Sequence, residues 1–353
     1  MKGATNIGFS LSTLLHWKVE SNNSSWLNEN ISEFKSSQQD SLNNVTWDIC
    51  VKQVGEINLD RDAKNVSEGI YCLHESIYII DKFSNKKAHF KIKNKSYELD
   101  VETGFTFHYY AALLDAFIKI IAFQKGIVTL HASAIKRANK VSVFAAWRRM
   151  GKTTAILNIL NKEDTIQVLA DDAVMITKEG KLIPYLRGID LYPYLPIPQN
   201  YLRINDKLKR HLAKFLQNFP LLPNKLRSKV IKRFLLPRLN LAVFGHASLI
   251  ESVEVDNFYA IKKHLKGITQ KNNITASELK NFIGRSSYFE IIEYQAIFEM
   301  VCSVYPKSNF SKLIIDYKTF QDKVNHVISS DSIMLELNLS KDYSDIKDLI
   351  SII

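Results

Sequence analysis

Apolar and polar residues follow two different rhythms along this chain, and the change falls near residue 104. Before it, three segments alternate in polarity or are rich in β-branched residues, which predicts β-strands. These segments cover 45–51, 69–80 and 88–99. The stretch 20–44 is rich in Ser and Asn and predicts a long loop. We therefore expect a β-rich N-terminal domain over residues 1–104.

Apolar residues then recur at helical spacing between 105 and 124, which predicts an amphipathic helix that ends at Gly126. Beyond it, short apolar segments alternate with helical ones. Predicted strands cover 127–134, 141–144, 165–170, 174–176, 182–185, 253–262, 312–316 and 333–337. Predicted helices cover 152–161, 202–219, 224–236, 275–283, 288–305 and 342–352. This order predicts a mixed α/β (α+β) fold, with a second domain over residues 105–353.

Composition is that of a soluble globular protein, with 46% hydrophobic and 24% charged residues. The longest apolar stretch, 109–123, contains Asp115 and Lys119, so it is too short and too charged to span a bilayer. The N-terminal apolar run is interrupted by polar residues, unlike a secretory signal. The three cysteines are widely spaced, which favours a reducing compartment over a disulfide framework. We therefore expect a cytoplasmic protein without a transmembrane segment.

The formal net charge is +11, and nearly all of the surplus lies in one region. Residues 202–240 contain eleven Lys or Arg and one acidic residue, Asp206. The region predicts a basic helical insertion, which is either simply solvated or binds an anionic partner: an acidic peptide, a phosphorylated glycan, a membrane surface or nucleic acid. Its apolar stripe of Leu208, Leu212, Phe215 and Phe219 predicts a core contact. No DNA- or RNA-reading motif is present, so we expect no specific nucleic-acid partner.

The segment from Val141 to Thr154 has the strand, loop and helix context of a Walker A loop. It follows the pattern G-x-x-x-x-G-K-[ST], with Ala146 in place of the first glycine. We expect Lys152 to reach the β- and γ-phosphates of ATP and Thr153 to ligate magnesium, while the loop amides and the positive end of the next helix face the phosphates. The predicted nucleotide site comprises Ala146, Trp147, Arg148, Arg149, Met150, Gly151, Lys152, Thr153 and Thr154.

Three further positions are candidates for catalysis. Asp171 and Asp172 follow a predicted apolar strand, and carboxylates at that end of a strand can hold magnesium or accept a proton from an attacking hydroxyl. His131 lies among small residues shortly before the Walker-type strand. Arg187 follows the predicted hairpin and could stabilise the transferred phosphoryl group. Side-chain nucleophile motifs such as G-x-S-x-G are missing from the sequence, which disfavours a hydrolase of that kind.

Taken together, His131, the loop from Ala146 to Thr154 and the pair Asp171-Asp172 resemble the catalytic domain of the HPr kinase/phosphorylase family in order and spacing. The resemblance implies a phosphoenolpyruvate carboxykinase-like P-loop kinase domain behind the β-rich N-terminal domain. It implies that Asp171 is the base that deprotonates the acceptor, with His131 beside it. Asp172 and Thr153 would hold magnesium, although the sequence does not decide which aspartate has which role.

The family's later Glu-Ile-Arg-Gly signature, which serves the reverse phosphorolysis, is missing from this sequence, so we expect an acceptor other than HPr. The chain looks more like divergent relatives that lie beside peptide-modification or polysaccharide gene clusters. The expected function is ATP- and magnesium-dependent transfer of the γ-phosphoryl group to a hydroxyl, on a serine of a peptide or protein or on a sugar-like molecule. A nucleotide-binding regulatory module without transfer activity, a carboxykinase-like enzyme and a homo-oligomeric state remain open alternatives.

Overall fold

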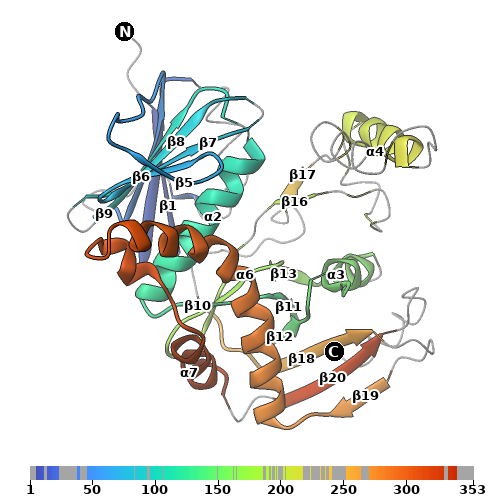
Figure 1. Ribbon diagram of the computed structural model, residues 1–353. Helices are drawn as coiled ribbons and strands as arrows, with labels where there is room; N and C mark the ends of the chain where they lie inside the picture. The colour runs from blue at the N-terminus through green and yellow to red at the C-terminus, as the bar shows by residue number, and fades with distance from the viewer. Residues whose placement is uncertain are drawn as a thin grey trace.

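The structure is a computed structural model, and Figure 1 shows its ribbon. It describes residues 5–11, 14–23, 38–39, 46–82, 84–93, 96–105, 107–148, 150–161, 163, 165–185, 188–190, 192, 195, 197, 202, 204–217, 223, 231, 235, 238–240, 252–263, 270–329 and 333–339. Across these residues the fold is mixed α/β with several sheets, as expected from the sequence.

Nine described strands of the N-terminal part form one sheet in the order β3-β1-β2-β4-β9-β8-β7-β6-β5. The strand β2 alternates buried and half-buried residues along its length, so one face of the sheet enters the core. The strands are β1 (Thr5–Leu11), β2 (Leu15–Ser21), β3 (Gln38–Gln39), β4 (Ile49–Val54), β5 (Lys64–Ser67), β6 (Ile70–Leu73), β7 (Ser76–Ile80), β8 (Lys87–Lys93) and β9 (Ser96–Glu102).

The predicted strand 69–80 is in fact the hairpin of β6 and β7, because His74 has a φ of 48° and turns the chain between them. The predicted strand 88–99 likewise divides into β8 and β9, which pair antiparallel. Strands β1 and β2 were not predicted, although they pair over their whole length.

Helix α2 (Phe107–Gln124) joins this sheet to the rest of the molecule (Figure 1). It ends where predicted, since Gly126 adopts a φ of 85° that favours glycine. Its Phe117 stacks on Phe90 of β8 with ring centroids 3.8 Å apart, and Phe298 packs on the same pair. One hydrophobic core therefore runs from the nine-stranded sheet into the C-terminal part.

The C-terminal part contains a six-stranded sheet in the order β13-β11-β12-β18-β20-β19 and smaller sheets β10-β14-β15 and β16-β17. Strand β12 pairs antiparallel with β11 and parallel with β18, so this sheet is mixed. The strands are β10 (Val128–Leu130), β11 (Ala132–Arg137), β12 (Lys140–Ala145), β13 (Gln167–Ala170), β14 (Val174–Ile176), β15 (Leu182–Ile183), β16 (Gly188–Asp190), β17 (Arg238–Asn240), β18 (Asn257–Lys263), β19 (Gln270–Asn273) and β20 (Ile333–Leu339).

The C-terminal part departs from the predicted elements in three places. The helices expected over 275–283 and 288–305 are one helix, α6 (Ala276–Val304), which runs from the six-stranded sheet towards the nine-stranded one (Figure 1). Residues Asn309–Leu313 form the short 3-10 helix η5 where a strand was expected. Helix α7 (Tyr317–Val327) was not predicted. The predicted helix 342–352 and most of the predicted helix 224–236 lie outside the described residues.

Helix α4 (Ile204–Gln217) occupies the first half of the basic region. Leu208, Leu212 and Phe215 were expected to face the core, but all three are exposed, while Phe219 lies outside the described residues. The stripe prediction is therefore wrong for this helix, which packs through the small side chain of Ala213 instead. Among the described helices, none has the length and apolar character needed to cross a membrane.

Candidate active site

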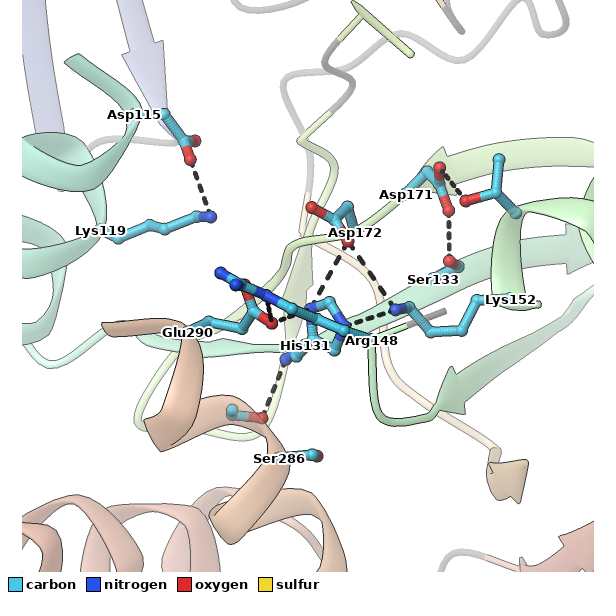
Figure 2. Close-up of polar contacts among 12 residues, drawn as sticks. Asp115, Lys119, His131, Ser133, Arg148, Lys152, Asp171, Asp172, Ser286 and Glu290 are labelled. Atoms are coloured by element: carbon cyan, nitrogen blue, oxygen red, sulfur yellow. Dashed lines mark hydrogen bonds and ion pairs between the residues drawn. The ribbon is translucent and has the colours of Figure 1, made fainter. Parts of the chain in front are cut away.

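The loop from 146 to 154 leads from β12 into the first turn of helix α3 (Lys152–Leu160), and Figure 2 shows Arg148 and Lys152 from this segment. Gly151 is the N-cap of α3 and has a φ of 94°, a left-handed conformation that favours glycine. Ala146 does not have a positive φ, so the backbone tolerates alanine where the Walker pattern has its first glycine. The backbone N–H of Met150 donates to the carbonyl of Trp147 (3.2 Å) and closes the turn.

Lys152 is the first residue of α3, and its side chain is buried. Its Nζ lies 2.7 Å from Nε2 of His131 and 3.7 Å from Oδ1 of Asp172. A buried ammonium needs such partners because burial removes its hydration. The contacts therefore place a cation, a histidine and a carboxylate at the N-terminal end of a helix.

Asp171 follows β13 and is almost completely buried. Its carboxylate accepts hydrogen bonds from the hydroxyl of Ser133 and from Oγ1 of Thr153 (2.8 Å). Burial, and then the neighbouring charge of Asp172, raise the pKa of the Asp171 carboxyl. This contact brings two oxygen-bearing side chains, Thr153 and Asp171, together where the 146–154 loop enters α3.

Asp172 is very different from its neighbour, because its side chain is 55% exposed and its φ is 65°. The left-handed backbone turns consecutive carboxylates towards different surroundings, Asp171 to Thr153 and Asp172 to His131 and Lys152. Figure 2 shows Asp171 directed towards Ser133 and Asp172 directed towards His131 and Lys152.

His131 lies between β10 and β11 with its ring buried. Since the ammonium of Lys152 can only donate, Nε2 of His131 accepts and the ring proton is assigned to Nδ1. Nδ1 makes no hydrogen bond among the described residues and faces two carboxylates, Asp172 at 3.5 Å and Glu290 at 3.6 Å. Burial and the charge of Lys152 lower the pKa of His131 to about 4, so the ring is neutral at pH 7.

Helix α6 supplies two site residues that the sequence analysis missed. Ser287 accepts a hydrogen bond from the backbone N–H of His131 (2.8 Å). Glu290 accepts from Nε (2.5 Å) and Nη2 (2.7 Å) of Arg148. Both residues lie on one helix face, three positions apart, but Ser287 fell in the gap between the predicted helices 275–283 and 288–305, which concealed that spacing.

The other residues predicted for the site differ in their surroundings and exposure. Trp147 is exposed and packs edge-on against Phe289 of α6, with ring centroids 6.1 Å apart. Met150 packs against the core beneath α3, and Thr154 lies within α3, where its carbonyl accepts from Asn158. The predicted site residues Arg149 and Arg187 lie outside the described part of the chain.

The described residues contain no ready-made cluster of three or more His, Cys, Asp or Glu side chains for a metal ion. Comparisons of the chain with models of known families and with curated proteins find no match. The geometry of His131, Lys152, Thr153 and the two aspartates is therefore the basis on which the function of the chain is inferred.

Proposed function

We propose that this chain is an ATP- and magnesium-dependent kinase that transfers the γ-phosphoryl group to a hydroxyl, on a serine of a peptide or protein. One observation carries the proposal: the 146–154 loop contacts both aspartates. Thr153 donates to Asp171 at 2.8 Å, and Lys152 lies 3.7 Å from Asp172. Phosphoryl transfer needs a phosphate-binding loop, a metal-binding oxygen pair and a proton acceptor in one place, and these contacts supply candidates for all three.

The nucleotide would bind at the N-terminal end of α3. Unpaired backbone N–H groups there attract anions, and Lys152 adds a positive charge beside them. Lys152 is held by His131 and Asp172, so its ammonium is positioned before any phosphate arrives. A positioned cation loses less side-chain entropy on binding than a mobile surface lysine.

Thr153 and Asp171 fit a magnesium ion in chemical terms. Magnesium prefers oxygen ligands and is usually held by one or two carboxylates together with substrate phosphates. When bound, magnesium would neutralise charge on the phosphate oxygens. Burial favours the protonated form of Asp171, and a nearby cation favours its charged form, so cation binding is coupled to proton release.

Asp172 is the better candidate for the base, which reverses the roles that the family resemblance implies. Its exposed carboxylate can meet an acceptor, whereas Asp171 is enclosed by Ser133 and Thr153. In this account the acceptor hydroxyl gives its proton to Asp172, its oxygen bonds to the γ-phosphorus, and ADP leaves. Nδ1 of the neutral His131 lies 3.5 Å from Oδ1 of Asp172, so the ring is placed to orient that carboxylate.

We also propose a fold similar to the nucleotide domain of phosphoenolpyruvate carboxykinase, and the mixed sheet is the observation behind this proposal. Doubly wound nucleotide-binding folds place the phosphate loop after a strand of a mostly parallel sheet. Here β12 lies between an antiparallel neighbour, β11, and a parallel one, β18. This arrangement agrees better with the family resemblance than with a Ras-like sheet.

The proposal is tested by magnesium-dependent ATP turnover and nucleotide binding, measured for the wild type, Asp172→Asn, Asp171→Asn and the exposed control Asp62→Asn. We expect Asp172→Asn to abolish turnover and retain ATP binding, and Asp171→Asn to raise the magnesium concentration that turnover requires. Serine-containing peptides and sugars would be supplied as acceptors. If the wild type binds ATP but shows no turnover with any acceptor, the chain is a nucleotide-binding regulatory module. If the wild type binds no nucleotide, both the kinase and the regulatory module are ruled out.

A further inference from the structure

Helix α4 packs onto the protein through the side that carries Arg210, Ala213 and Leu216. Ala213 is fully buried there, and Leu216 is partly buried beside it. From the same side, Nη2 of Arg210 donates to the carbonyls of Leu195 (2.8 Å) and Tyr192 (3.5 Å). These contacts fix which side of α4 faces away from the protein.

The opposite side of α4 carries four large apolar side chains, spaced so that they share one helix face. Their exposed fractions are 84% for Ile204, 67% for Leu208, 46% for Leu212 and 61% for Phe215. We name these four residues the α4 stripe. A soluble helix normally turns such a stripe towards its own core, so an outward stripe indicates an interaction surface.

Basic side chains border the α4 stripe on both sides. At 100° per residue, Lys207, His211 and Lys214 fall along one edge and Lys209 along the other. Asp206, the one acidic residue of α4, falls on the side that packs against the protein. The outward half of the helix therefore combines apolar contact area with positive charge.

We propose that the α4 stripe docks on an anionic lipid surface. Helices that lie in a membrane interface have an apolar face bordered by Lys or Arg, and the fluid interface accepts a convex helix. A peptide partner would instead need to offer a concave groove to that helix. A second copy of this chain would bring Lys207 and Lys214 of both helices together, and like charges oppose that contact.

The charge around α4 adds to the attraction. The segment 202–240 carries a formal charge of +10, and anionic lipids attract basic segments over about one Debye length, ~10 Å. Figure 1 shows α4 at the periphery, on the side of the molecule away from the nine-stranded sheet. Docking through α4 would therefore leave the N-terminal sheet clear of the bilayer. This inference does not depend on the proposed kinase activity.

The test measures partition of the full chain onto vesicles of phosphatidylcholine alone and of phosphatidylcholine with phosphatidylglycerol. We expect the wild type to bind only the anionic vesicles, and less so as salt is raised. The double variants Ile204→Gln/Leu208→Gln and Lys207→Gln/Lys214→Gln should each lower partition on the order of tenfold. The matched control Lys93→Gln/Lys178→Gln removes the same charge from exposed lysines elsewhere and should bind like the wild type.

Three results would overturn the proposal. The first is that the wild type does not bind anionic vesicles, or that the Ile204→Gln/Leu208→Gln variant binds them as well as the wild type does. The second is binding of a poly-glutamate peptide, but not of vesicles, through the same residues, which would assign the surface to an acidic peptide. The third is self-association in light scattering that the Ile204→Gln/Leu208→Gln variant removes, which would assign it to a second copy. Because these variants change exposed side chains, we expect their thermal unfolding to match that of the wild type.

Discussion

Glu290 of α6 holds the guanidinium of Arg148 through two oxygens, across 142 positions of the chain. Arg148 lies in the loop that we propose binds phosphate, and a carboxylate and a phosphate offer a guanidinium similar paired oxygens. Glu290 therefore occupies Arg148 in the way that a phosphate would. The same carboxylate lies 3.6 Å from His131, so it connects the loop to the catalytic candidates.

The first prediction concerns this ion pair. Replacing Glu290 with Gln removes a charge that competes with phosphate for Arg148, so we expect the dissociation constant for ATP to fall by about three- to tenfold. Titration calorimetry measures the change. Glu299→Gln, an exposed residue of the same helix, is the matched control and should leave the affinity unaltered. Unaltered or weaker ATP binding by Glu290→Gln would show that the pair does not compete with the nucleotide.

The second prediction concerns pH and His131. The pKa of His131 is lowered from 6.5 to about 4, so between these values the unfolded chain binds a proton that the folded chain does not. The free energy of unfolding therefore decreases as pH falls from 6.5 to 4, by up to about 3 kcal/mol. The raised pKa of Asp171 has the opposite effect, because it stabilises the folded chain as pH falls. Comparing the wild type with a variant that lacks His131 but keeps Asp171 removes this contribution from the difference.

Denaturant unfolding of the wild type and of His131→Asn at several pH values tests this dependence. The free energy of unfolding of His131→Asn should fall less steeply than that of the wild type between pH 6.5 and 4. His211→Asn, at an exposed position of α4, is the control and should follow the wild-type curve. Parallel curves for the wild type and His131→Asn would contradict a buried, neutral histidine.

The third prediction concerns Gly284, where α6 meets α7. A Cβ at this position would lie 1.9 Å from Oε1 of Gln321, which accepts from the hydroxyl of Tyr317, while Nε2 of Gln321 donates to Lys280 and Asn325. Overpacking costs about 1–3 kcal/mol, and the better helix propensity of alanine offsets about 1. We expect Gly284→Ala to lower the free energy of unfolding by about 1 kcal/mol.

A double-mutant cycle separates overpacking from other causes. In a Gln321→Ala background the clash is gone, so Gly284→Ala should become stabilising by about 0.5–1 kcal/mol. If Gly284→Ala lowered the free energy of unfolding equally in both backgrounds, the destabilisation would not come from contact with Gln321.

Gly284 also shows why part of the fold could not be predicted. In the sequence it stands between two helical patterns and predicts a break, yet its role is to let α7 approach α6 closely. That requirement comes from Gln321, which is distant in the sequence. The predicted division of α6 also concealed the spacing of Ser287 and Glu290, because Ser287 fell between the two predicted helices and only Glu290 lay within one of them.

Local patterns were sufficient for the centre of the site. Strand β12, helix α3 and strand β13 lie close to their predicted bounds, because each has its own apolar pattern and its own Gly or Asp boundary. The pattern of α4 misled for another reason. Its apolar stripe obeys helical spacing, but spacing alone does not decide whether such a stripe meets the core or the outside.

The central claim is that Lys152 belongs to a nucleotide phosphate site, and calorimetric titration with ATP and magnesium tests it most directly. The comparison is the wild type with Lys152→Met, which keeps the apolar stem at a buried position, and with Lys140→Met at an exposed position of β12. We predict ATP binding by the wild type and Lys140→Met, weakened at least about tenfold in Lys152→Met, since the lost contact joins opposite charges. Equal binding by all three proteins, or binding by none, would contradict the account.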